Sequence, residues 1–363
     1  MRGHTDGVGG VAFFNDGHRV VTGSRDKTLR IWNAQRGMLL GEPLQGHQES
    51  VLSVAVSPDD RRVASGGQDN IVIIWDVERK QIVFKLKHKE SVNCVCFSPD
   101  GKRLASGSND GTAAIWDTMT GSVLTALVVQ GVWMLSVAFS PDGLKLASGA
   151  LDGIIRVCQT GKATYILLKF KAHEFGACGI AWSPDGQQLI SASWDKKVKF
   201  WNSSTGRQIG QPCTDGRTDC IRSLAIASDG SFIATASDDK TVRLWSTKTY
   251  QQMGQPLEHP NKVLRIAISA DGALLASGTE NENLYLWSVG NTLQRRDGQE
   301  GYEEELEVEQ QPRISEIVSL HLPSHLMWSD LNRKCCRCPP SEVSISSQRL
   351  NDSQVRSFCP VSV

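Results

Sequence analysis

Five histidines with a repeated spacing carry most of the recognisable chemistry in this 363-residue sequence. Each lies 22 residues before an Asp or Asn, and a Ser or Thr stands four residues before that second position. Imidazole, carboxylate and hydroxyl are the groups of acid–base and metal sites. They also form buried hydrogen-bond chains, in which a hydroxyl accepts an indole N–H and an imidazole donates to a carboxylate. Such a chain pins a loop to a strand, so we predict that the histidines are structural.

The hydrogen-bond set occurs seven times, with substitutions in some copies. A Trp follows six residues after the acidic position in every copy except the fourth, where Cys158 replaces it. The histidine position holds His4, His47, His88, Gln130, His173, Arg217 and His259. The acidic position holds Asp26, Asp69, Asp110, Asp152, Asp195, Asp239 and Asn281. The hydroxyl position holds Thr22, Ser65, Ser106, Ser148, Ser191, Thr235 and Ser277.

The elements that must position these groups repeat every 41–44 residues. Each unit contains four short runs in which β-branched and apolar residues alternate with others, and this alternation is typical of strands. Turns such as Asp100–Gly101 and Asp142–Gly143 favour a tight hairpin between the first two runs. Seven four-stranded units cannot each bury their own apolar faces, but radial stacking buries them. The sequence therefore predicts an all-β fold, a seven-bladed β-propeller of four-stranded antiparallel blades, over residues 1–290.

The repeats resemble those of the WD-repeat family of β-propellers. The dipeptide Gly-His stands at Gly3–His4 and Gly46–His47, and Trp-Asp stands at Trp75–Asp76 and Trp116–Asp117. Their regularity further resembles that of fungal NACHT–WD-repeat sensor proteins, although the chain has no nucleotidase region. The family resemblance implies a rigid, generally non-catalytic platform for proteins or peptides. It also implies that the histidine loops and the acidic turns share one rim, where partners contact recurrent positions.

Those contact positions hold two Trp and two Leu on the fourth and fifth units, and basic residues on the sixth, seventh and first. We predict that the aromatic group contacts a partner, with mutual packing of the Trp residues as the alternative. The basic group could receive acidic or phosphorylated peptides. The predicted partner-binding residues are Trp133, Leu135, Leu151, Trp194, Arg25, Arg222 and Lys262.

Three units depart from the repeat. The fourth, with Gln130 and Cys158, lacks both ends of the hydrogen-bond chain, and we expect this blade to be less rigid. Arg217 leaves the sixth unit without its His, and Asn281 weakens the seventh. Ring closure is a further difficulty, because only two residues precede the first Gly-His. The last blade must use residues 289–296, use a later strand such as 313–322, or remain three-stranded.

Residues 291–363 form a separate segment, which is acidic at first and then rich in Ser, Pro and Cys. This composition predicts a largely disordered tail. A zinc site is conceivable there, but the spacing does not match the usual paired ligands, so we favour free thiols. The candidate ligands are His321, His325, Cys335, Cys336 and Cys338.

Overall charge limits the classes of partner. The sequence has 39 basic and 39 acidic side chains, whereas a general nucleic-acid binder normally has a basic surplus. The N-terminus has no apolar signal segment, so its ten Cys are predicted to be thiols in the cytoplasm, with the nucleus as the alternative. The uncharged stretch 118–141 is apolar enough to resemble a membrane-spanning segment, but the repeat divides it into two strands. We therefore expect no membrane partner.

Three functions were weighed from these features. The first is a non-catalytic scaffold or sensor module that binds a peptide or partner domain on the top face. The second is a substrate-recognition or assembly subunit of a larger complex, for example of ubiquitin-ligase type. The third and most distant is a hydrolase-type propeller enzyme, for which the sequence offers neither a nucleophile elbow nor a Walker loop. No cofactor, metal or small-molecule substrate is predicted.

Overall fold

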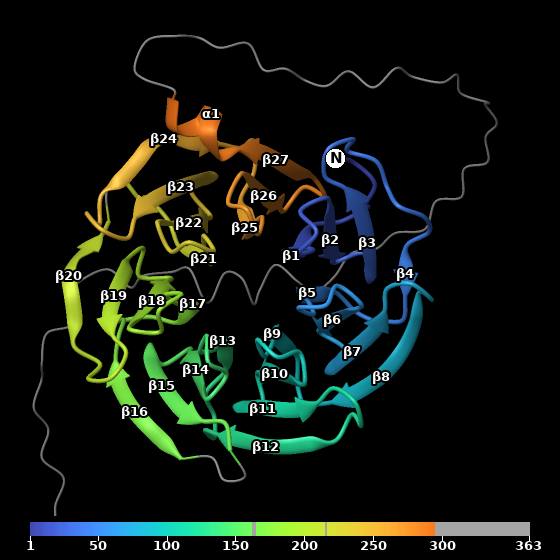
Figure 1. Ribbon diagram of the computed structural model, residues 1–363, viewed down its shortest axis with the longest axis horizontal. Helices are drawn as coiled ribbons and strands as arrows, with labels where there is room; N and C mark the ends of the chain where they lie inside the picture. Colours follow the sequence, from blue (N-terminus) through green and yellow to red (C-terminus); the bar gives the residue numbers. More distant parts are fainter. Residues whose placement is uncertain (162–164, 215, 295–363) are drawn as a thin grey trace, which may run out of the picture. The chain divides into compact units, whose positions relative to one another are not determined.

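A computed structural model of the protein describes residues 1–294, except residues 162–164 and 215. Within that part, seven antiparallel sheets are arranged around a central axis, with the first strand of each sheet innermost (Figure 1). The predicted seven-bladed β-propeller is thereby confirmed. Six described sheets contain four strands and the last contains three.

The first four blades each pair their strands in chain order. Blade one contains β1 (Val8–Phe13), β2 (Arg19–Ser24), β3 (Thr28–Asn33) and β4 (Leu44–Gln45). Blade two contains β5 (Val51–Val56), β6 (Arg62–Gly67), β7 (Ile71–Asp76) and β8 (Gln81–Lys87). Blade three contains β9 (Val92–Phe97), β10 (Arg103–Ser108), β11 (Thr112–Asp117) and β12 (Val123–Val128). Blade four contains β13 (Met134–Phe139), β14 (Lys145–Ala150), β15 (Ile154–Gln159) and β16 (Ile166–Lys171).

The remaining blades follow the same order and are succeeded by one short helix. Blade five contains β17 (Ala177–Trp182), β18 (Gln188–Ser193), β19 (Val198–Asn202) and β20 (Gln208–Cys213). Blade six contains β21 (Ile221–Ile226), β22 (Phe232–Ser237), β23 (Thr241–Ser246) and β24 (Gln252–Glu258). Blade seven contains β25 (Val263–Ile268), β26 (Leu274–Thr279) and β27 (Leu284–Ser288), and α1 is Val289–Gln294.

The apolar core lies between blades rather than within them. Seven clusters of buried residues each join two neighbouring blades. In the cluster of blades five and six, for example, Phe200 packs with Trp245, and both are fully buried. Alternation places one face of each strand towards each neighbour, so a blade buries its apolar side chains only when both neighbours are present. The ring is therefore the unit that holds the interaction rim in place.

Turns set the register of each blade in the predicted way. In blade three, the Ser98 hydroxyl donates to Asp100 at 2.5 Å, and Gly101 adopts a φ of 69°, which favours glycine. The uncharged stretch that a hydropathy search would select divides into β12 and β13, as expected. No helix of the described residues is long and apolar enough to cross a membrane.

Blade seven closes the ring without a fourth strand in the described part of the chain. A fourth strand formed by residues 289–296 was one predicted closure, and it is wrong, because residues 289–294 form α1. The strand expected at 313–322 lies outside the described residues. Met1 instead bonds to β27: its amino group donates to the Leu284 carbonyl at 2.7 Å, and its carbonyl accepts the Leu284 N–H at 3.2 Å. Val8 and Leu284 then pack in one buried cluster between blades one and seven.

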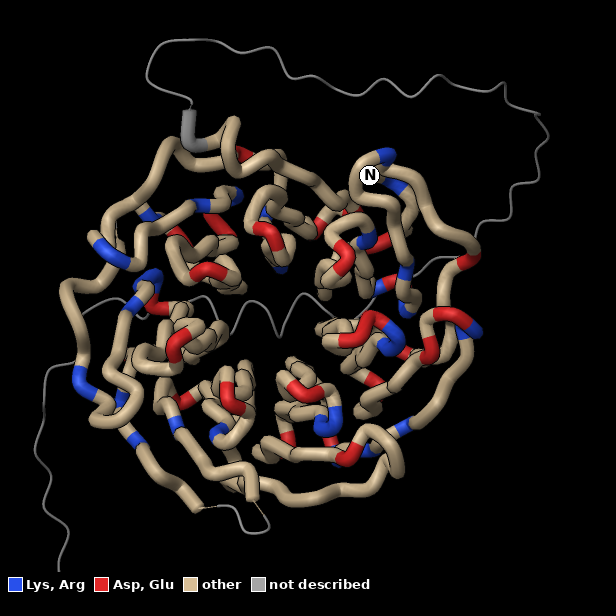
Figure 2. The backbone as a smooth tube through the Cα atoms, viewed as in Figure 1, with Lys and Arg blue, Asp and Glu red and all other residues tan. Residues whose placement is uncertain are grey.

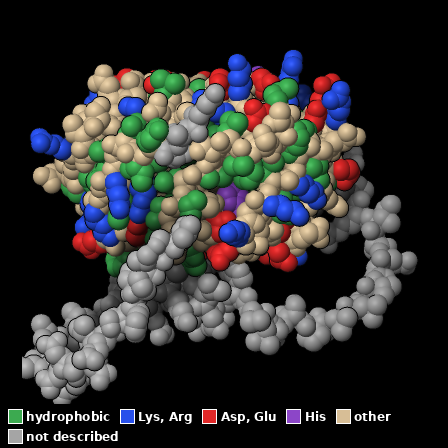
Figure 3. All heavy atoms as spheres, turned by 90° about the horizontal axis from the view of Figure 1, so that it is seen from below, with side chains coloured by type: hydrophobic (Ala, Val, Ile, Leu, Met, Phe, Trp, Pro, Cys, Tyr) green, Lys and Arg blue, Asp and Glu red, His purple; other side chains and the backbone are tan. Residues whose placement is uncertain are grey.

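The outer wall exposes several apolar side chains. On β12, Val123 and Leu124 are 56% and 47% exposed, and on β16 Ile166 and Leu167 are similarly exposed. Figure 3 shows hydrophobic side chains scattered among charged ones on the wall seen from below.

Contacts divide the chain into two units, Met1–Glu303 and Glu304–Val363. The predicted disordered tail and its zinc ligands lie outside the described residues.

Candidate protein-interaction face

Buried hydrogen-bond chains of the predicted composition fix one rim of the propeller. In blade one, Trp32 Nε1 donates to Thr22 Oγ1 at 2.8 Å, His4 Nε2 lies 2.7 Å from the same hydroxyl, and His4 Nδ1 lies 2.7 Å from Asp26. Because a carboxylate only accepts, Nδ1 carries the proton and Nε2 accepts from the hydroxyl. Asp26 also accepts the backbone N–H of Thr5, which ties the histidine loop to the acidic turn. The same chain occurs in blades two, three and five, through His47, His88 and His173.

Burial lowers the pKa of two of these imidazoles, those of His88 and His173. Burial lowers the pKa of His173, and the neighbouring Asp195 only partly offsets this effect. Burial in turn raises the pKa of Asp195, but the hydrogen bond and charge of His173 outweigh it and hold that pKa below its usual value. His173 is only 2% exposed. The geometry therefore supports the structural role over a catalytic one.

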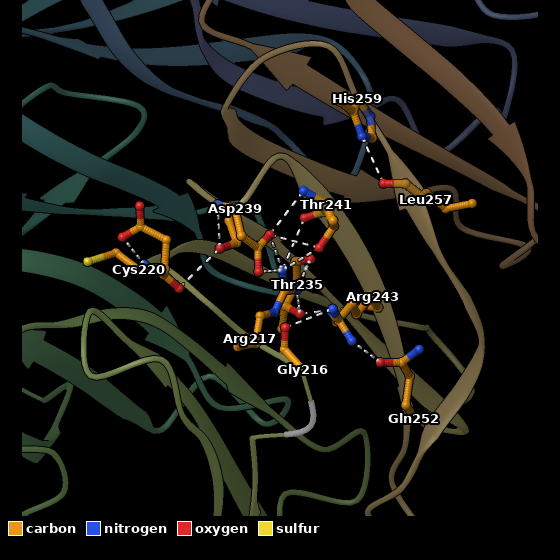
Figure 4. A network of polar contacts seen from close by, with 12 residues as sticks. Gly216, Arg217, Cys220, Thr235, Asp239, Thr241, Arg243, Gln252, Leu257 and His259 are labelled. Atoms are coloured by element: carbon orange, nitrogen blue, oxygen red, sulfur yellow. Dashed lines mark hydrogen bonds and ion pairs between the residues drawn. The ribbon is translucent and has the colours of Figure 1, made fainter.

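In blade six an arginine replaces the histidine without breaking the chain (Figure 4). Arg217 Nη1 donates to Asp239 at 2.9 Å, and its Nη2 donates to Thr235 Oγ1, which also accepts from Trp245 Nε1 at 2.9 Å. Arg217 thus leaves this blade without its His, as the sequence indicates, but it preserves the link between the hydroxyl and the carboxylate. A guanidinium is long and forked enough to reach both partners of the missing imidazole.

Blades four and seven use different substitutes. In blade four, Arg156 Nη2 donates to Asp152 at 2.7 Å from a side chain that is almost completely buried, so a charge pair takes the place of the histidine. In blade seven, His259 keeps its contact with Ser277 at 2.8 Å, but its Nδ1 lies 3.0 Å from the Leu257 carbonyl. Asn281 is not the partner of His259, in agreement with the expected weakening.

The inner strand of every blade contains a β-bulge near its start. In each blade the pairing of the first two strands shifts register around the second residue of the inner strand. A bulge rotates the backbone locally and redirects its side chain. The positions concerned include two of the predicted contact residues, Leu135 and Arg222, together with Cys178, and all three line the central channel.

The aromatic residues predicted to contact a partner lie on adjoining blades. A Cβ on Gly176 would lie 2.7 Å from Leu135 and 3.2 Å from Trp194, so these two side chains meet above that glycine. Trp133 and Leu151 are linked by a backbone hydrogen bond of 2.9 Å. Mutual packing of Trp133 and Trp194 would require a contact between their rings. The ring–ring contacts of the described residues do not include this pair. Their role in binding stays a prediction.

The basic residues contact this aromatic group and also form ion pairs with neighbouring carboxylates. The Arg222 guanidinium lies 5.7 Å from the Trp194 ring centre, within cation–π range. Arg222 also pairs with Asp238 at 2.6 Å, and Lys262 reaches the same carboxylate at 3.8 Å. Arg25 pairs with Glu280 at 3.6 Å. The predicted basic group is therefore partly neutralised, and Figure 2 shows both signs of charge interspersed around the ring.

Sequence reasoning missed two residues. Phe175 is 48% exposed in the loop between His173 and Gly176, beside the aromatic group. Its position two residues after the histidine could have drawn attention to it. Arg265, the third residue of β25, lines a cavity of about 180 Å³ in the central channel, with Leu135, Cys178 and Arg222 also in its wall. An alignment of the seven units would have shown Arg265 as the only charged residue at its place.

Comparison with known proteins agrees with this geometry. The family model described as the IFT122 first β-propeller matches residues 10–215, and the model of the WD domain, G-beta repeat, matches residues 210–246 and 251–288. The chain therefore belongs to the WD-repeat β-propeller family. WD repeat-containing protein 1 of Gallus gallus is 48% identical over 44 residues, which is 12% of this chain and 7% of that protein. The chain thus matches only a small part of the length of that relative. These matches do not extend to the narrower resemblance to fungal NACHT–WD-repeat proteins.

The fold and the family define a class of interaction platform. WD-repeat propellers are typically non-enzymatic scaffolds that bind protein partners. Among the described residues, no group of three or more His, Cys, Asp or Glu side chains could hold a metal ion. In that part, Cys94, Cys96, Cys158 and Cys178 are free thiols.

Proposed function

We propose that the protein is a non-catalytic interaction scaffold or sensor module, which binds a peptide or partner domain on the rim of blades four to six. The observation that carries this proposal is the continuous group of Leu135, Trp194 and Arg222 from three blades. Aromatic side chains beside an arginine are the residue types that dominate binding energy at interfaces. The hydrogen-bonded rim holds them in place before binding, which lowers the entropic cost of association.

The buried thiols support a non-catalytic role. Burial raises the pKa of Cys94, Cys96 and Cys178 to about 12, so these sulfurs remain protonated at neutral pH. A thiol nucleophile needs the opposite shift. The five histidines of the repeat are occupied in hydrogen bonds to the hydroxyl position. The proposal therefore includes no cofactor and no small-molecule substrate.

The wider setting belongs to the same proposal. We place the function in the cytoplasm, with a protein or peptide as partner and not a nucleic acid or membrane. The sensor role rests on the likeness of the repeats to those of fungal NACHT–WD-repeat proteins. A role as substrate-recognition or assembly subunit would use the same rim, together with a docking segment elsewhere.

A peptide selection tests the rim directly. Random peptides displayed on phage are selected on the wild-type protein, and the affinities of the winning peptides are measured by fluorescence polarisation. We expect Trp133→Ala/Trp194→Ala to weaken binding at least about tenfold, equivalent to about 1.4 kcal/mol. The matched control is Val123→Ser/Leu124→Ser, which alters exposed side chains of the outer wall. It should retain wild-type affinity.

The result that contradicts the proposal is equal affinity in all three proteins, since the selected peptides would then bind elsewhere. Circular dichroism establishes that each variant is folded. A further arm uses Arg222→Glu with acidic peptides. If their affinity is unchanged, the basic group takes no part in recognition.

A further inference from the structure

Arg265 differs from every other residue at its level of the central channel. It is the third residue of its inner strand, and the equivalent residues of the other six blades are small. They are Gly10, Ser53, Cys94, Ser136, Gly179 and Ser223. All seven residues line the same cavity of about 180 Å³. At this level of the channel, Arg265 therefore contributes the one guanidinium among the seven residues, and the other six blades contribute small, uncharged residues.

The hydrogen bonds of Arg265 leave its charge uncompensated. Its Nη1 donates to the backbone carbonyls of Leu264 at 3.0 Å and Arg222 at 3.4 Å. The ion pairs found in the described part of the chain do not include this guanidinium, whereas Asp238 pairs with Arg222 and Glu280 pairs with Arg25. A cation taken out of bulk water without a counter-charge is unfavourable.

Two further arginines, Arg222 and Arg25, lie near enough to Arg265 to affect its pKa. Burial lowers the pKa of Arg265, and the charges of Arg222 and Arg25 lower it further. The sulfurs of Cys94 and Cys178 lie near enough to interact, but these thiols have a pKa of about 12 and stay neutral. Among the described residues, Arg222 and Arg25 have carboxylate partners, whereas the charge of Arg265 in the channel has none.

Hydroxyl groups in the same wall can donate to an anion. Ser53 Oγ accepts the Val95 N–H at 3.2 Å, and Ser136 Oγ accepts the Ile180 N–H at 3.0 Å. Each hydroxyl thus uses an acceptor site and keeps a proton to donate. The cavity of about 180 Å³ is several times the roughly 30 Å³ that one water occupies in the liquid. It has room for a phosphate group or a side-chain carboxylate.

From this arrangement we infer that the central channel contains a binding site for one anionic group, a carboxylate or a phosphate, whose charge is met by Arg265. The group is either a free ion or the end of a side chain that a bound peptide inserts from the rim. The inference goes beyond the proposed interaction face and does not depend on it. Charge-assisted hydrogen bonds from a guanidinium match both anions, because they can form in parallel pairs.

Titration calorimetry at fixed ionic strength tests the site with two probes, inorganic phosphate and a short peptide with one phosphoserine. Chloride of equal ionic strength is the reference. We expect the wild-type protein to bind at least one probe, and Arg265→Gln to bind it about tenfold or more weakly. Arg265→Lys should be intermediate, since it keeps the charge but not the planar fork. The matched control, Arg207→Gln, removes an exposed arginine outside the channel and should bind as the wild type does.

The two probes distinguish the sources of the anion. Binding of both, abolished in Arg265→Gln, indicates a free-ion site; binding of the peptide alone indicates insertion of a side chain. The inference is overturned if neither probe binds the wild-type protein, or if Arg265→Gln binds as tightly. A thermal melt provides a second readout: phosphate or peptide should raise the melting temperature of the wild type but not of Arg265→Gln. Should that variant fail to fold, Arg265→Met, which also removes the charge, takes its place, and binding as tight as that of the wild type would again overturn the inference.

Discussion

The hydroxyl at the centre of each hydrogen-bond chain shows how much one polar atom can organise. Thr235 Oγ1 accepts from both Trp245 and Arg217, and Ser277 Oγ accepts from Trp287 while it contacts His259. Both hydroxyls are fully buried. A buried hydroxyl that lost these partners would be left unsatisfied, at a cost of about 1–3 kcal/mol. The third partner can be imidazole or guanidinium, because the hydroxyl can donate or accept.

The pH dependence of stability should therefore include a contribution from His259. Burial lowers the pKa of His259 from 6.5 to about 4, so the unfolded chain takes up a proton at a higher pH than the folded chain does. Its contribution to stability is complete above pH 6.5 and is lost as the pH falls towards 4. From pH 7.5 to pH 5 we expect this histidine to remove about 2 kcal/mol of unfolding free energy.

Urea unfolding at the two pH values measures this contribution. His259→Gln, with the residue type that blade four carries at its histidine position, should be about 1 kcal/mol less stable at pH 7.5 because it loses the Ser277 bond. It should then lose about 2 kcal/mol less than the wild type on acidification. Equal losses in the two proteins would show that His259 is not buried in the neutral form.

Arg217 makes a second prediction at the scale of one residue. Its guanidinium and Asp239 form a buried pair, and burial lowers the pKa of Arg217 to about 10. Arg217→Ala should destabilise the protein by about 3–5 kcal/mol, because Asp239 remains buried without its partner. Arg217→His restores the side chain of the other blades and removes the unpaired Nε, so we expect a change below about 1 kcal/mol. Urea denaturation compares the two; equal destabilisation would mean that the size of the side chain, and not its charge, is what blade six requires.

At the scale of elements, spacing and alternation were sufficient to predict the blades. The Trp and Asp positions marked the same strand in every copy, and the Asp–Gly turns marked its neighbours. The rim was harder to predict. The bulge near Leu135 and Arg222 is a backbone feature with no residue signature. The substitution of Arg156 for a histidine depends on a fold that brings its side chain back to Asp152. The sequence alone did not show that Arg265 lies in the central channel, where the six equivalent residues of the other blades are small.

The three-stranded blade should be the least protected element. Within residues 1–294, its outer strand, β27, pairs with β26 on one side and bonds with Met1 on the other. Unpaired edges open more readily, so native-state hydrogen exchange of Val263–Ile268 should be about tenfold or more faster than that of Val51–Val56. Both segments are innermost strands, which makes the comparison direct. Equally slow exchange would contradict the prediction and imply that α1 and the side-chain packing protect blade seven fully.

At the scale of the whole ring, the contact between blades one and seven differs from the others, because no short connection joins them along the chain. Leu284 is almost fully buried in the cluster that spans this contact, and Leu29 is as deeply buried in the cluster of blades one and two. Either residue changed to Ala should remove about 2–5 kcal/mol of stability. Leu284→Ala should in addition loosen the ring at its closure.

Hydrogen exchange separates these two effects. In Leu284→Ala, exchange in β1 and β25–β27 should accelerate more than exchange in β13–β15, because the ring opens where no chain connection holds it. In Leu29→Ala, the closure remains packed and the chain still joins blades one and two, so exchange should accelerate evenly around the ring. Even acceleration in both variants would mean that the closure is as strong as any other contact. The propeller would then present its rim as one cooperative body, with no weaker sector in blades one and seven.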